Sequence, residues 1–149
     1  MSEVATVAPP ETAAALIIGN ELLSGKITDA NLVVLARTLS ELGIRLERAV
    51  MVLDDRAAIA AEVKALAASH DVLFTSGGVG PTHDDLTIDA VADAFDVAVE
   101  ASAPIEQMLR AYYGEPLTPS HLRMARIPAG ADLVISAEMP WPTVVMQNV

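Results

Sequence analysis

The chain has 149 residues, 52% of them hydrophobic but only 3% aromatic, which suits one globular domain whose core is filled by Leu, Val, Ile and Ala. Its formal net charge of −11, from 9 basic and 20 acidic residues, argues against a nucleic-acid partner, because Lys and Arg supply most of the affinity for a phosphate backbone. It contains no cysteine, which excludes disulfides and thiolate metal sites and fits a cytoplasmic protein, and no apolar run is long enough to span a membrane.

Residues 1–12 are predicted to form a flexible leader. Their first eleven residues have neither a basic start nor an apolar centre, so they do not predict a signal peptide. We expect one folded domain over residues 13–149, with no internal repeat and no second domain.

Apolar runs alternate with helical periodicity through the first two thirds of this domain. Strands are predicted at 13–18, 44–53 and 71–75, and helices follow them at 29–42, 55–68 and 86–95. Strand–helix repeats of this length imply parallel strands joined by right-handed crossovers. The fold class is therefore α/β with a mostly parallel sheet.

The last third of the chain is less regular. Helices are predicted from residue 102 to about 113 and from 118 to about 126, each with a proline in its first turn. Strand candidates at 131–135 and 143–148 follow, separated by the segment 138–142.

A glycine-rich loop after the third predicted strand is the most informative motif. It reads Thr75-Ser76-Gly77-Gly78-Val79-Gly80-Pro81-Thr82-His83-Asp84-Asp85-Leu86-Thr87. Its glycines let backbone N–H groups approach a ligand, and the helix start that follows adds unsatisfied donors and a positive dipole end. The predicted phosphate contacts are Ser76, Gly77, Gly78, Gly80 and Thr87.

The same loop ends in two carboxylates, Asp84 and Asp85. A phosphate beside them would be repelled unless a divalent cation such as Mg²⁺ lay between them. The loop therefore predicts a site for phosphate and metal together. The alternative is that its glycines only make the corner between strand and helix, and that Thr87 caps or braces the helix start. The loop is neither a Walker loop nor a dinucleotide fingerprint, since it lacks the Lys of the first and the last Gly of the second.

Other polar residues follow the first and second predicted strands. Open α/β sheets bind ligands at the carboxyl ends of their strands, so Asn20 and Glu21 are expected to converge with Asp54 and Asp55 if the strands are neighbours. The alternatives are that Asp54 or Asp55 caps the second helix and that Glu21 is an ordinary exposed turn residue.

The glycine loop resembles the signature of the molybdopterin-binding (MoaB/Mog) domains. The chain also contains Gly19-Asn20-Glu21-Leu22-Leu23-Ser24-Gly25-Lys26, Asn31, a helix end at 39–43 and Asp54-Asp55. Together with the glycine loop, this set of motifs is most similar to the amino-terminal domain of the competence/damage-inducible CinA proteins. It is equally similar to the molybdopterin-binding-like domain of FAD synthases. The resemblance runs from about Ala13 to Val149.

This resemblance implies a three-layer α/β/α sandwich and a set of site residues. Asp54 and Asp85 correspond to the functional acidic pair and are the predicted catalytic residues and metal ligands, with Asp84 as a further metal ligand. Ser24 and Gly25 correspond to a Ser-Gly pair that adds backbone donors at a second anion position. His83 is a possible ligand contact, better suited as a protonated phosphate partner than as a base. The families form dimers or trimers, so a homo-oligomer is expected.

The implied function is metal-dependent hydrolysis of a nucleotide diphosphate bond, of the ADP-ribose or FAD type. The alternatives are molybdopterin binding and adenylylation in molybdenum cofactor biosynthesis, and a non-catalytic binding or assembly module. Two departures from the family bear on this choice: residues 138–141 replace a Gly-rich stretch, and relatives continue past Val149 into a Pro-Gly-x-Pro loop. The second departure predicts that the chain is a fragment truncated at its C-terminus.

Overall fold

A computed structural model describes residues 8–26, 28–139 and 141–149, so residues 1–7 of the predicted leader lie outside it. In chain order the elements are β1 (Thr12–Ile18), α1 (Asn20–Leu23), α2 (Asn31–Glu41), β2 (Arg45–Val52), α3 (Arg56–Ser69), β3 (Val72–Ser76), α4 (Thr87–Ala94), β4 (Val99–Ala101), α5 (Ala103–Tyr113), α6 (Pro119–Met124), β5 (Arg126–Pro128), β6 (Asp132–Val134) and β7 (Thr143–Val145). None of the helices in these described ranges has the length and apolar character needed to cross a bilayer.

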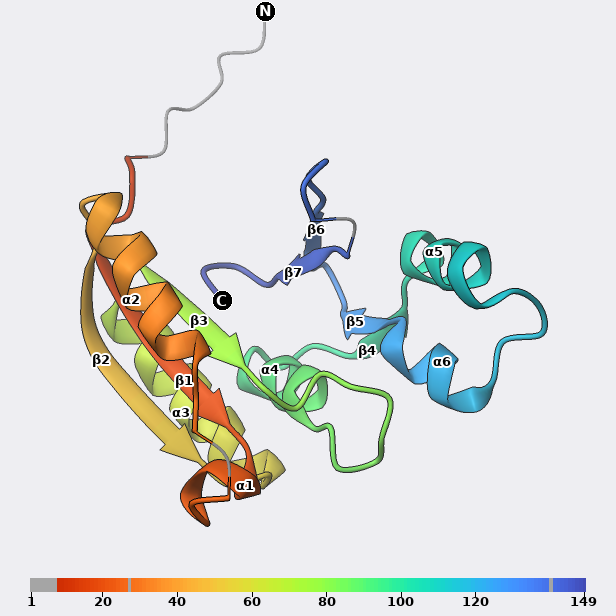
Figure 1. Ribbon diagram of the computed structural model, residues 1–149, viewed down its shortest axis with the longest axis horizontal. Helices are drawn as coiled ribbons and strands as arrows, with labels where there is room; N and C mark the ends of the chain where they lie inside the picture. The colour runs from red at the N-terminus through yellow and green to blue at the C-terminus, as the bar shows by residue number, and fades with distance from the viewer. Residues whose placement is uncertain (1–7, 27, 140) are drawn as a thin grey trace, which may run out of the picture.

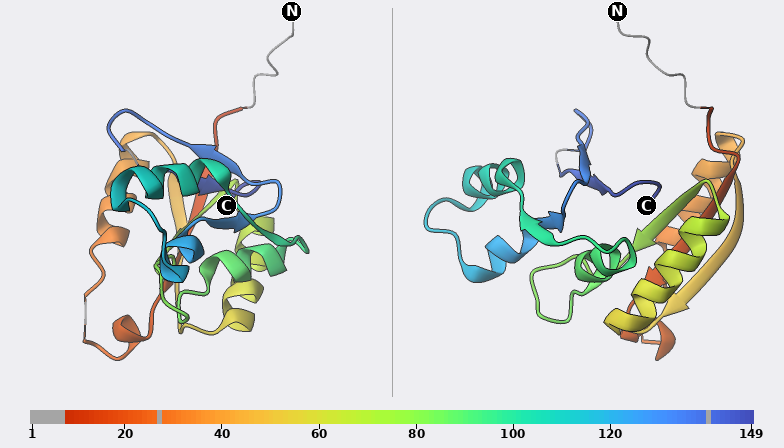
Figure 2. Two further views of the ribbon diagram at one scale, coloured as in Figure 1. Left: turned by 90° about the vertical axis from the view of Figure 1, so that its right-hand side faces the viewer. Right: turned by 180° about the vertical axis from the view of Figure 1, so that it is seen from behind.

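A three-stranded parallel sheet forms the centre of the domain. Its order is β2-β1-β3, and Leu16 of β1 lies between Val50 of β2 and Thr75 of β3. Helix α2 covers one face of the sheet and α3 covers the other (Figures 1 and 2). The predicted α/β/α layering and parallel strands are confirmed.

The central strand β1 is buried on both faces. All residues from 13 to 18 are at most 2% exposed, as expected of a parallel strand with helices on both sides. Leu16 and Ile18 point toward α3 and join Ile59, Val63 and Leu66 in the main core. The apolar run that predicted this strand is therefore also what anchors α3 to the sheet.

The second half of the chain lies beside β3 and carries its own small core (Figure 1). Buried residues from α5, from the end of α6 and from β5 form it: Ile105, Leu109, Ala125 and Ile127. Its strands pair antiparallel, β4 with β5 and β6 with β7. Asn148 ties the end of the chain to the sheet, since its carbonyl oxygen accepts a 2.8 Å hydrogen bond from the Leu73 N–H and its side chain donates to Ala67 and His70.

One predicted helix is shorter than expected, and α1, β4 and β5 are short elements that the sequence did not predict. The predicted helix through residue 126 ends at Met124, because the Ala125 N–H turns back to the Leu122 carbonyl at 3.2 Å and the chain then enters β5. Strands β4 and β5 have three residues each and α1 has four, so none carries enough of a periodic pattern to be recognised.

Asp71 fixes the start of the central strand. Its Oδ2 accepts hydrogen bonds from the backbone N–H groups of Thr12 and Glu11, both at 2.9 Å, and from the Thr12 hydroxyl at 3.0 Å. These donors hold the pKa of the Asp71 carboxyl below its ordinary value. Residues 11 and 12, expected in the leader, are thus attached to the sheet.

Replacing Asp71 with Asn should lower the melting temperature at neutral pH. Because the folded pKa is depressed, the stabilisation is present above the unfolded pKa and is lost as the pH falls through the folded pKa. The difference in melting temperature between the parent and Asp71→Asn should therefore shrink in acid, measured by circular dichroism. Asp132→Asn, at an exposed position in β6, is the matched control and should leave the melting temperature nearly unchanged. A difference that stays constant down to strongly acid pH would contradict this account.

Candidate functional site

The glycine loop packs tightly against its surroundings. Gly77 and Gly78 have φ values of 99° and 64°, a region that favours glycine. A Cβ on Gly77 would overlap the carbonyl oxygen of Ile18 at the end of β1, and one on Gly78 would overlap the hydroxyl of Thr87. These two glycines are required for the corner itself, whatever else the loop does.

Thr87 braces the loop from the first turn of α4. Its hydroxyl donates to the Gly77 carbonyl at 2.7 Å, and its backbone N–H donates to the Gly78 carbonyl at 3.0 Å. The residue is 1% exposed and provides no side-chain cap for α4, whose N-cap is Leu86. The structure thus shows the bracing role, which engages both donors of Thr87 within the loop.

Two consecutive backbone N–H groups of the loop take no part in this bracing. Within the described residues, the structure shows no intramolecular hydrogen bond from the backbone N–H of Gly78 or of Val79. Both residues line a cavity beside the loop. Because an N–H group without a protein partner requires water or a ligand, this pair has the arrangement of an anion site.

Asp85 is held beside these donors. Its Oδ2 accepts hydrogen bonds from the Thr82 N–H at 2.8 Å and the Thr82 hydroxyl at 2.6 Å. Partial burial would raise the pKa of the Asp85 carboxyl, but these bonds, the Gly80 N–H and the charge of Arg123 together hold that pKa below its ordinary value. Asp85 is therefore a fixed, ionised carboxylate at neutral pH.

His83 and Asp84 form the outer tip of the loop. Their side chains are 91% and 75% exposed, and His83 Nε2 lies 3.2 Å from Asp84 Oδ1. A contact this exposed contributes little to stability, so it does little to fix the two side chains.

The polar residues at the ends of β1 and β2 bind one another. The Asn20 N–H donates to Asp54 Oδ2 at 3.0 Å, and the Asp54 N–H donates to Asn20 Oδ1 at 3.1 Å. The cap of α3 is Asp55, whose carboxylate accepts from the Ala58 N–H at 2.8 Å. The capping alternative is thus correct for Asp55, and Asp54 instead joins two strand ends.

The predicted metal ligands do not form a protein-only cluster. Across the described parts of the chain, no three His, Asp or Glu side chains are placed to hold a metal ion together. Mg²⁺, however, is commonly bound by one or two carboxylates and the phosphates of a ligand, an arrangement for which Asp85 beside the loop is suited. The divalent-cation site stays a prediction.

The remaining predicted contacts are engaged locally. The Ser24 hydroxyl donates to the Glu21 carbonyl at 3.1 Å, and the Gly25 N–H donates to the Leu22 carbonyl at 3.1 Å, both within the turn after α1. Ser76 accepts a 2.8 Å hydrogen bond from the Asn31 side chain, which joins α2 to the end of β3. No side-chain hydrogen bond among the described residues links Glu21 or Ser24 to the glycine loop.

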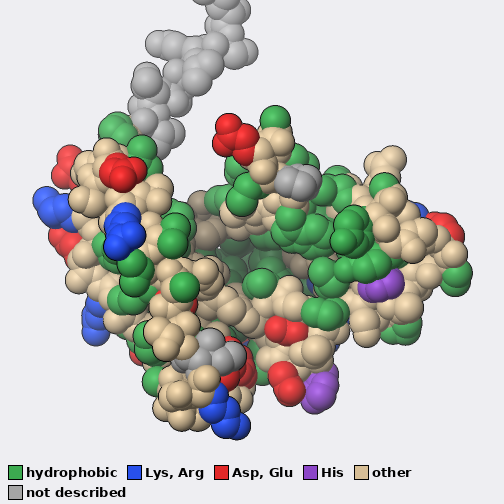
Figure 3. Space-filling view, in the orientation of Figure 1, with side chains coloured by type: hydrophobic (Ala, Val, Ile, Leu, Met, Phe, Trp, Pro, Cys, Tyr) green, Lys and Arg blue, Asp and Glu red, His purple; other side chains and the backbone are tan. Residues whose placement is uncertain are grey.

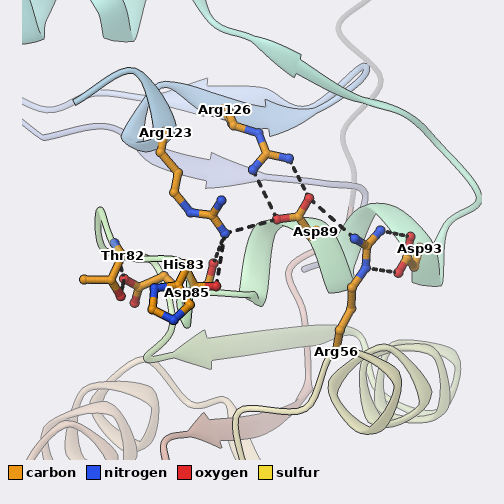
Figure 4. A network of polar contacts seen from close by, with 8 residues as sticks. All are labelled: Arg56, Thr82, His83, Asp85, Asp89, Asp93, Arg123 and Arg126. Carbon is orange, nitrogen blue, oxygen red and sulfur yellow. Dashed lines mark hydrogen bonds and ion pairs between the residues drawn. The ribbon is translucent and has the colours of Figure 1, made fainter. Parts of the chain in front are cut away.

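A buried carboxylate and three arginines lie next to the loop, and the sequence did not indicate them. Asp89 on α4 is 8% exposed and receives Arg126 at 2.6 and 3.3 Å, with Arg56 3.8 Å away (Figure 4). Arg123 of α6 lies 3.9 Å from Asp89 and donates to the backbone carbonyls of Asp85 at 3.1 Å and His83 at 3.5 Å. The available signal was Asp89 on the apolar face of its helix, since a buried carboxylate requires a partner.

A cavity of about 230 Å³ joins these parts. Its lining includes Gly78, Val79 and Gly80 of the loop together with Arg123 and Arg126. Its remaining walls are largely apolar and include Val91, Ile105, Met124, Trp141, Val144, Met146 and Val149. Figure 3 shows hydrophobic side chains around a hollow on this face of the molecule, with carboxylates nearby. The site can thus accept an anion attached to a less polar group.

Comparison with known proteins agrees with this arrangement. A family described as a probable molybdopterin binding domain matches residues 14–142. The chain belongs to the molybdopterin-binding domain family. Relatives of this family domain include a CinA-like protein of Myxococcus xanthus, 42% identical over 135 residues, which cover 89% of the chain and 32% of that protein. A probable FAD synthase of Caenorhabditis elegans is 38% identical over 68% of the chain and 20% of its own length.

Solved structures show the same fold. The CinA protein of Thermoplasma acidophilum matches this molybdopterin-binding family domain with a TM-score of 0.81 and 28% identity, over 89% of the chain and 80% of that protein. The tungsten cofactor synthesizing protein MoaB of Pyrococcus furiosus matches with a TM-score of 0.56 and 23% identity, over 93% of this chain and 81% of that protein. The resemblance to CinA, FAD synthase and MoaB/Mog domains is confirmed.

Replacing Thr87 with Val should loosen the glycine loop of this family domain. Val keeps the shape of Thr but removes the hydroxyl, leaving the Gly77 carbonyl without its donor in a buried position, which costs about 1–3 kcal/mol. Thr87→Ser keeps the hydroxyl and loses one methyl, at about 1 kcal/mol. Urea unfolding should therefore rank Val below Ser in stability. A Ser variant no more stable than Val would show that the methyl packing of Thr87, rather than its hydrogen bond, holds the loop.

Proposed function

We propose that this domain binds a phosphate of a nucleotide or a pterin on the glycine loop and hydrolyses a nucleotide diphosphate with the help of a divalent cation. The observation that carries the proposal is that Gly78 and Val79 line a cavity and that their N–H groups have no hydrogen-bond partner among the described residues. Phosphate oxygens are suitable acceptors for such a pair.

The chain's own residues supply the rest of the proposed site. Asp85 is ionised and fixed beside the loop, so it would hold the cation against the phosphate, with Asp84 as a further ligand. Asp54 is the second proposed catalytic carboxylate and follows β2, which is separated from β3 by the central strand β1. When bound, a divalent cation neutralises phosphate charge and makes water a better nucleophile at neutral pH.

Molybdopterin binding, with adenylylation, is the second candidate. It is favoured by the family description matched over residues 14–142, whereas the relative with 42% identity is CinA-like. Incubation with ADP-ribose, FAD, or molybdopterin plus ATP, each with and without Mg²⁺, separates hydrolysis from adenylylation. Binding without turnover in every case would instead support a non-catalytic module.

Other properties of the whole protein are part of the same proposal. The chain spans about a third of the CinA-like relative it matches. Activity of the complete protein, self-association and a cytoplasmic location are therefore expectations carried from the family and the composition.

Gly80→Ala is the sharpest test of phosphate binding by the loop. Gly80 has no positive φ, and an added Cβ would lie 2.8 Å from Asp85 Oδ2, so it would crowd the carboxylate without breaking the corner. We expect the affinity for inorganic phosphate to fall severalfold in calorimetry, with less than about 1 kcal/mol lost in stability. Gly78→Ala is unsuitable for this test, because its Cβ would overlap the Thr87 hydroxyl and the loss of stability would mask any effect on binding.

Gly43→Ala is the matched control for the Gly80 test. Gly43 ends α2 with a φ of 75° and open space around it, so Ala there carries only a backbone cost of about 1 kcal/mol. It should lower stability and leave phosphate affinity unchanged. If Gly80→Ala binds phosphate as tightly as the parent, the loop is a corner and the proposed function loses its basis.

Asp85→Asn should abolish Mg²⁺-dependent hydrolysis of ADP-ribose or FAD while the domain stays folded. The substitution removes the charge that would hold the cation and weakens the bonds from Thr82, at a cost of about 1–2 kcal/mol. Turnover and urea unfolding are measured on the same samples, with Asp132→Asn as the charge-matched control. Full turnover by Asp85→Asn would exclude the proposed metal role.

A further inference from the structure

We propose that Arg123 is a second anion-binding position beside the glycine loop, so that the domain recognises two linked phosphates rather than one. This inference rests on the proposed function, because the first phosphate is the one placed on the Gly78 and Val79 N–H groups. Neither the family description nor the relatives assign a role to Arg123.

Arg123 reaches the loop from a distant part of the sequence. It lies on α6, yet its guanidinium donates to the carbonyl oxygen of Asp85, 38 residues earlier, at 3.1 Å (Figure 4). It lines the same cavity as Gly78 and Gly80. A ligand bound by the loop would therefore meet this guanidinium inside one cavity.

The charge of Arg123 is the least neutralised of the three arginines around Asp89. Arg126 makes two hydrogen bonds to Asp89, at 2.6 and 3.3 Å, and Arg56 makes two to Asp93, at 2.5 and 2.6 Å. Among the described residues, the only carboxylate within 4.0 Å of Arg123 is Asp89, at 3.9 Å. Arg123 thus has no carboxylate hydrogen-bonded to it in the described part of the chain, although its charge also acts on the Asp85 carboxyl.

The guanidinium of Arg123 also has donors to offer. Its contacts with His83, Asp85 and Asp89 all use Nη2, and within the described residues Nε and Nη1 donate to no protein acceptor. Its side chain is 28% exposed. The N–H groups of Nε and Nη1 can each donate to a phosphate oxygen from their own edge of the planar guanidinium, and the Asp85 and His83 carbonyls hold that plane in place through Nη2.

The surroundings of Arg123 are open to a ligand. Arg123 and Arg126 also line a shallow hollow on the outer side of the loop, together with Thr82, His83 and Ser120. In a chain with a net charge of −11, these guanidiniums would offset part of the repulsion between the neighbouring carboxylates and a multiply charged anion.

The experiment compares inorganic phosphate with pyrophosphate by calorimetry, at fixed ionic strength and a fixed excess of Mg²⁺. The parent should bind pyrophosphate more tightly than phosphate. Arg123→Gln keeps a donor for the loop carbonyls but removes the charge, and it should lower the affinity for pyrophosphate about tenfold, the size of one charge-assisted hydrogen bond, while phosphate affinity changes less than about twofold.

Two further variants make the comparison specific. Arg110→Gln removes one positive charge from α5, where Arg110 pairs with Glu106 and Glu115, and should leave the preference for pyrophosphate unchanged. Arg123→Lys keeps the charge and should keep most of the preference. If Arg123→Gln does not fold by circular dichroism, the Lys variant decides: loss of the preference in a folded Lys variant overturns the inference.

The outcomes separate this inference from the proposed function. If Arg123→Gln lowers both affinities by the same factor, or neither, Arg123 only positions the loop and the inference is overturned while phosphate binding stands. If the folded parent binds neither anion, the proposed function fails and the inference fails with it.

Discussion

The contact between the glycine loop and the end of β1 determines how the site is built. Gly77 and Gly78 bring their backbone against Ile18 and Thr87 at distances that a side chain would not permit. This contact places the loop directly over the carboxyl end of the central strand, where ligands bind in open α/β sheets. It also leaves the N–H groups of Gly78 and Val79, two residues that line the cavity, without a hydrogen-bond partner among the described residues. The need for glycine at the corner and the availability of donors thus have the same cause.

Three arginines gather next to the glycine loop although the chain is acidic overall. The molecule carries a net charge of −11, yet three arginines from α3, α6 and β5 gather on Asp89 of α4. Burying Asp89 is tolerable only because these guanidiniums surround it. The arginines in turn join the second half of the chain to the parallel sheet, since Arg123 also holds the loop that follows β3. Binding at the loop and the packing of the two halves therefore share residues.

The sequence predicted the parallel sheet and its helices well because their signals are local. The buried run of β1, the capping Asp55 and the periodic faces of α2 and α3 can each be recognised within a window of about fifteen residues. The glycine loop was recognised for the same reason. The sequence predicted both a bracing role and a phosphate contact for Thr87, because a hydroxyl that braces a loop and one that binds phosphate occupy the same place in the motif.

What the sequence did not predict depends on contacts between distant segments. Arg123 and Arg126 carry no pattern that would indicate Asp89 as their partner, because that pairing arises only when α6 and β5 fold onto α4. The mutual hydrogen bonds of Asn20 and Asp54 depend likewise on the order of the strands. The expected convergence of carboxylates was an argument about neighbouring strand ends, and the structure shows that such neighbours can use their polar groups to bind one another.

The position of β1 also has a consequence for synthesis of the chain. β1 leaves the ribosome before both strands of its sheet that it pairs with, since β2 follows more than thirty residues later and β3 about sixty residues later. Until both have emerged, the apolar run from 13 to 18 has no sheet to join and stays exposed as an unpaired, aggregation-prone segment. Its three alanines expose less apolar surface than larger side chains would, which limits the tendency of the run to aggregate. Within the parallel sheet, the strand that organises it is thus the one that waits longest for its partners.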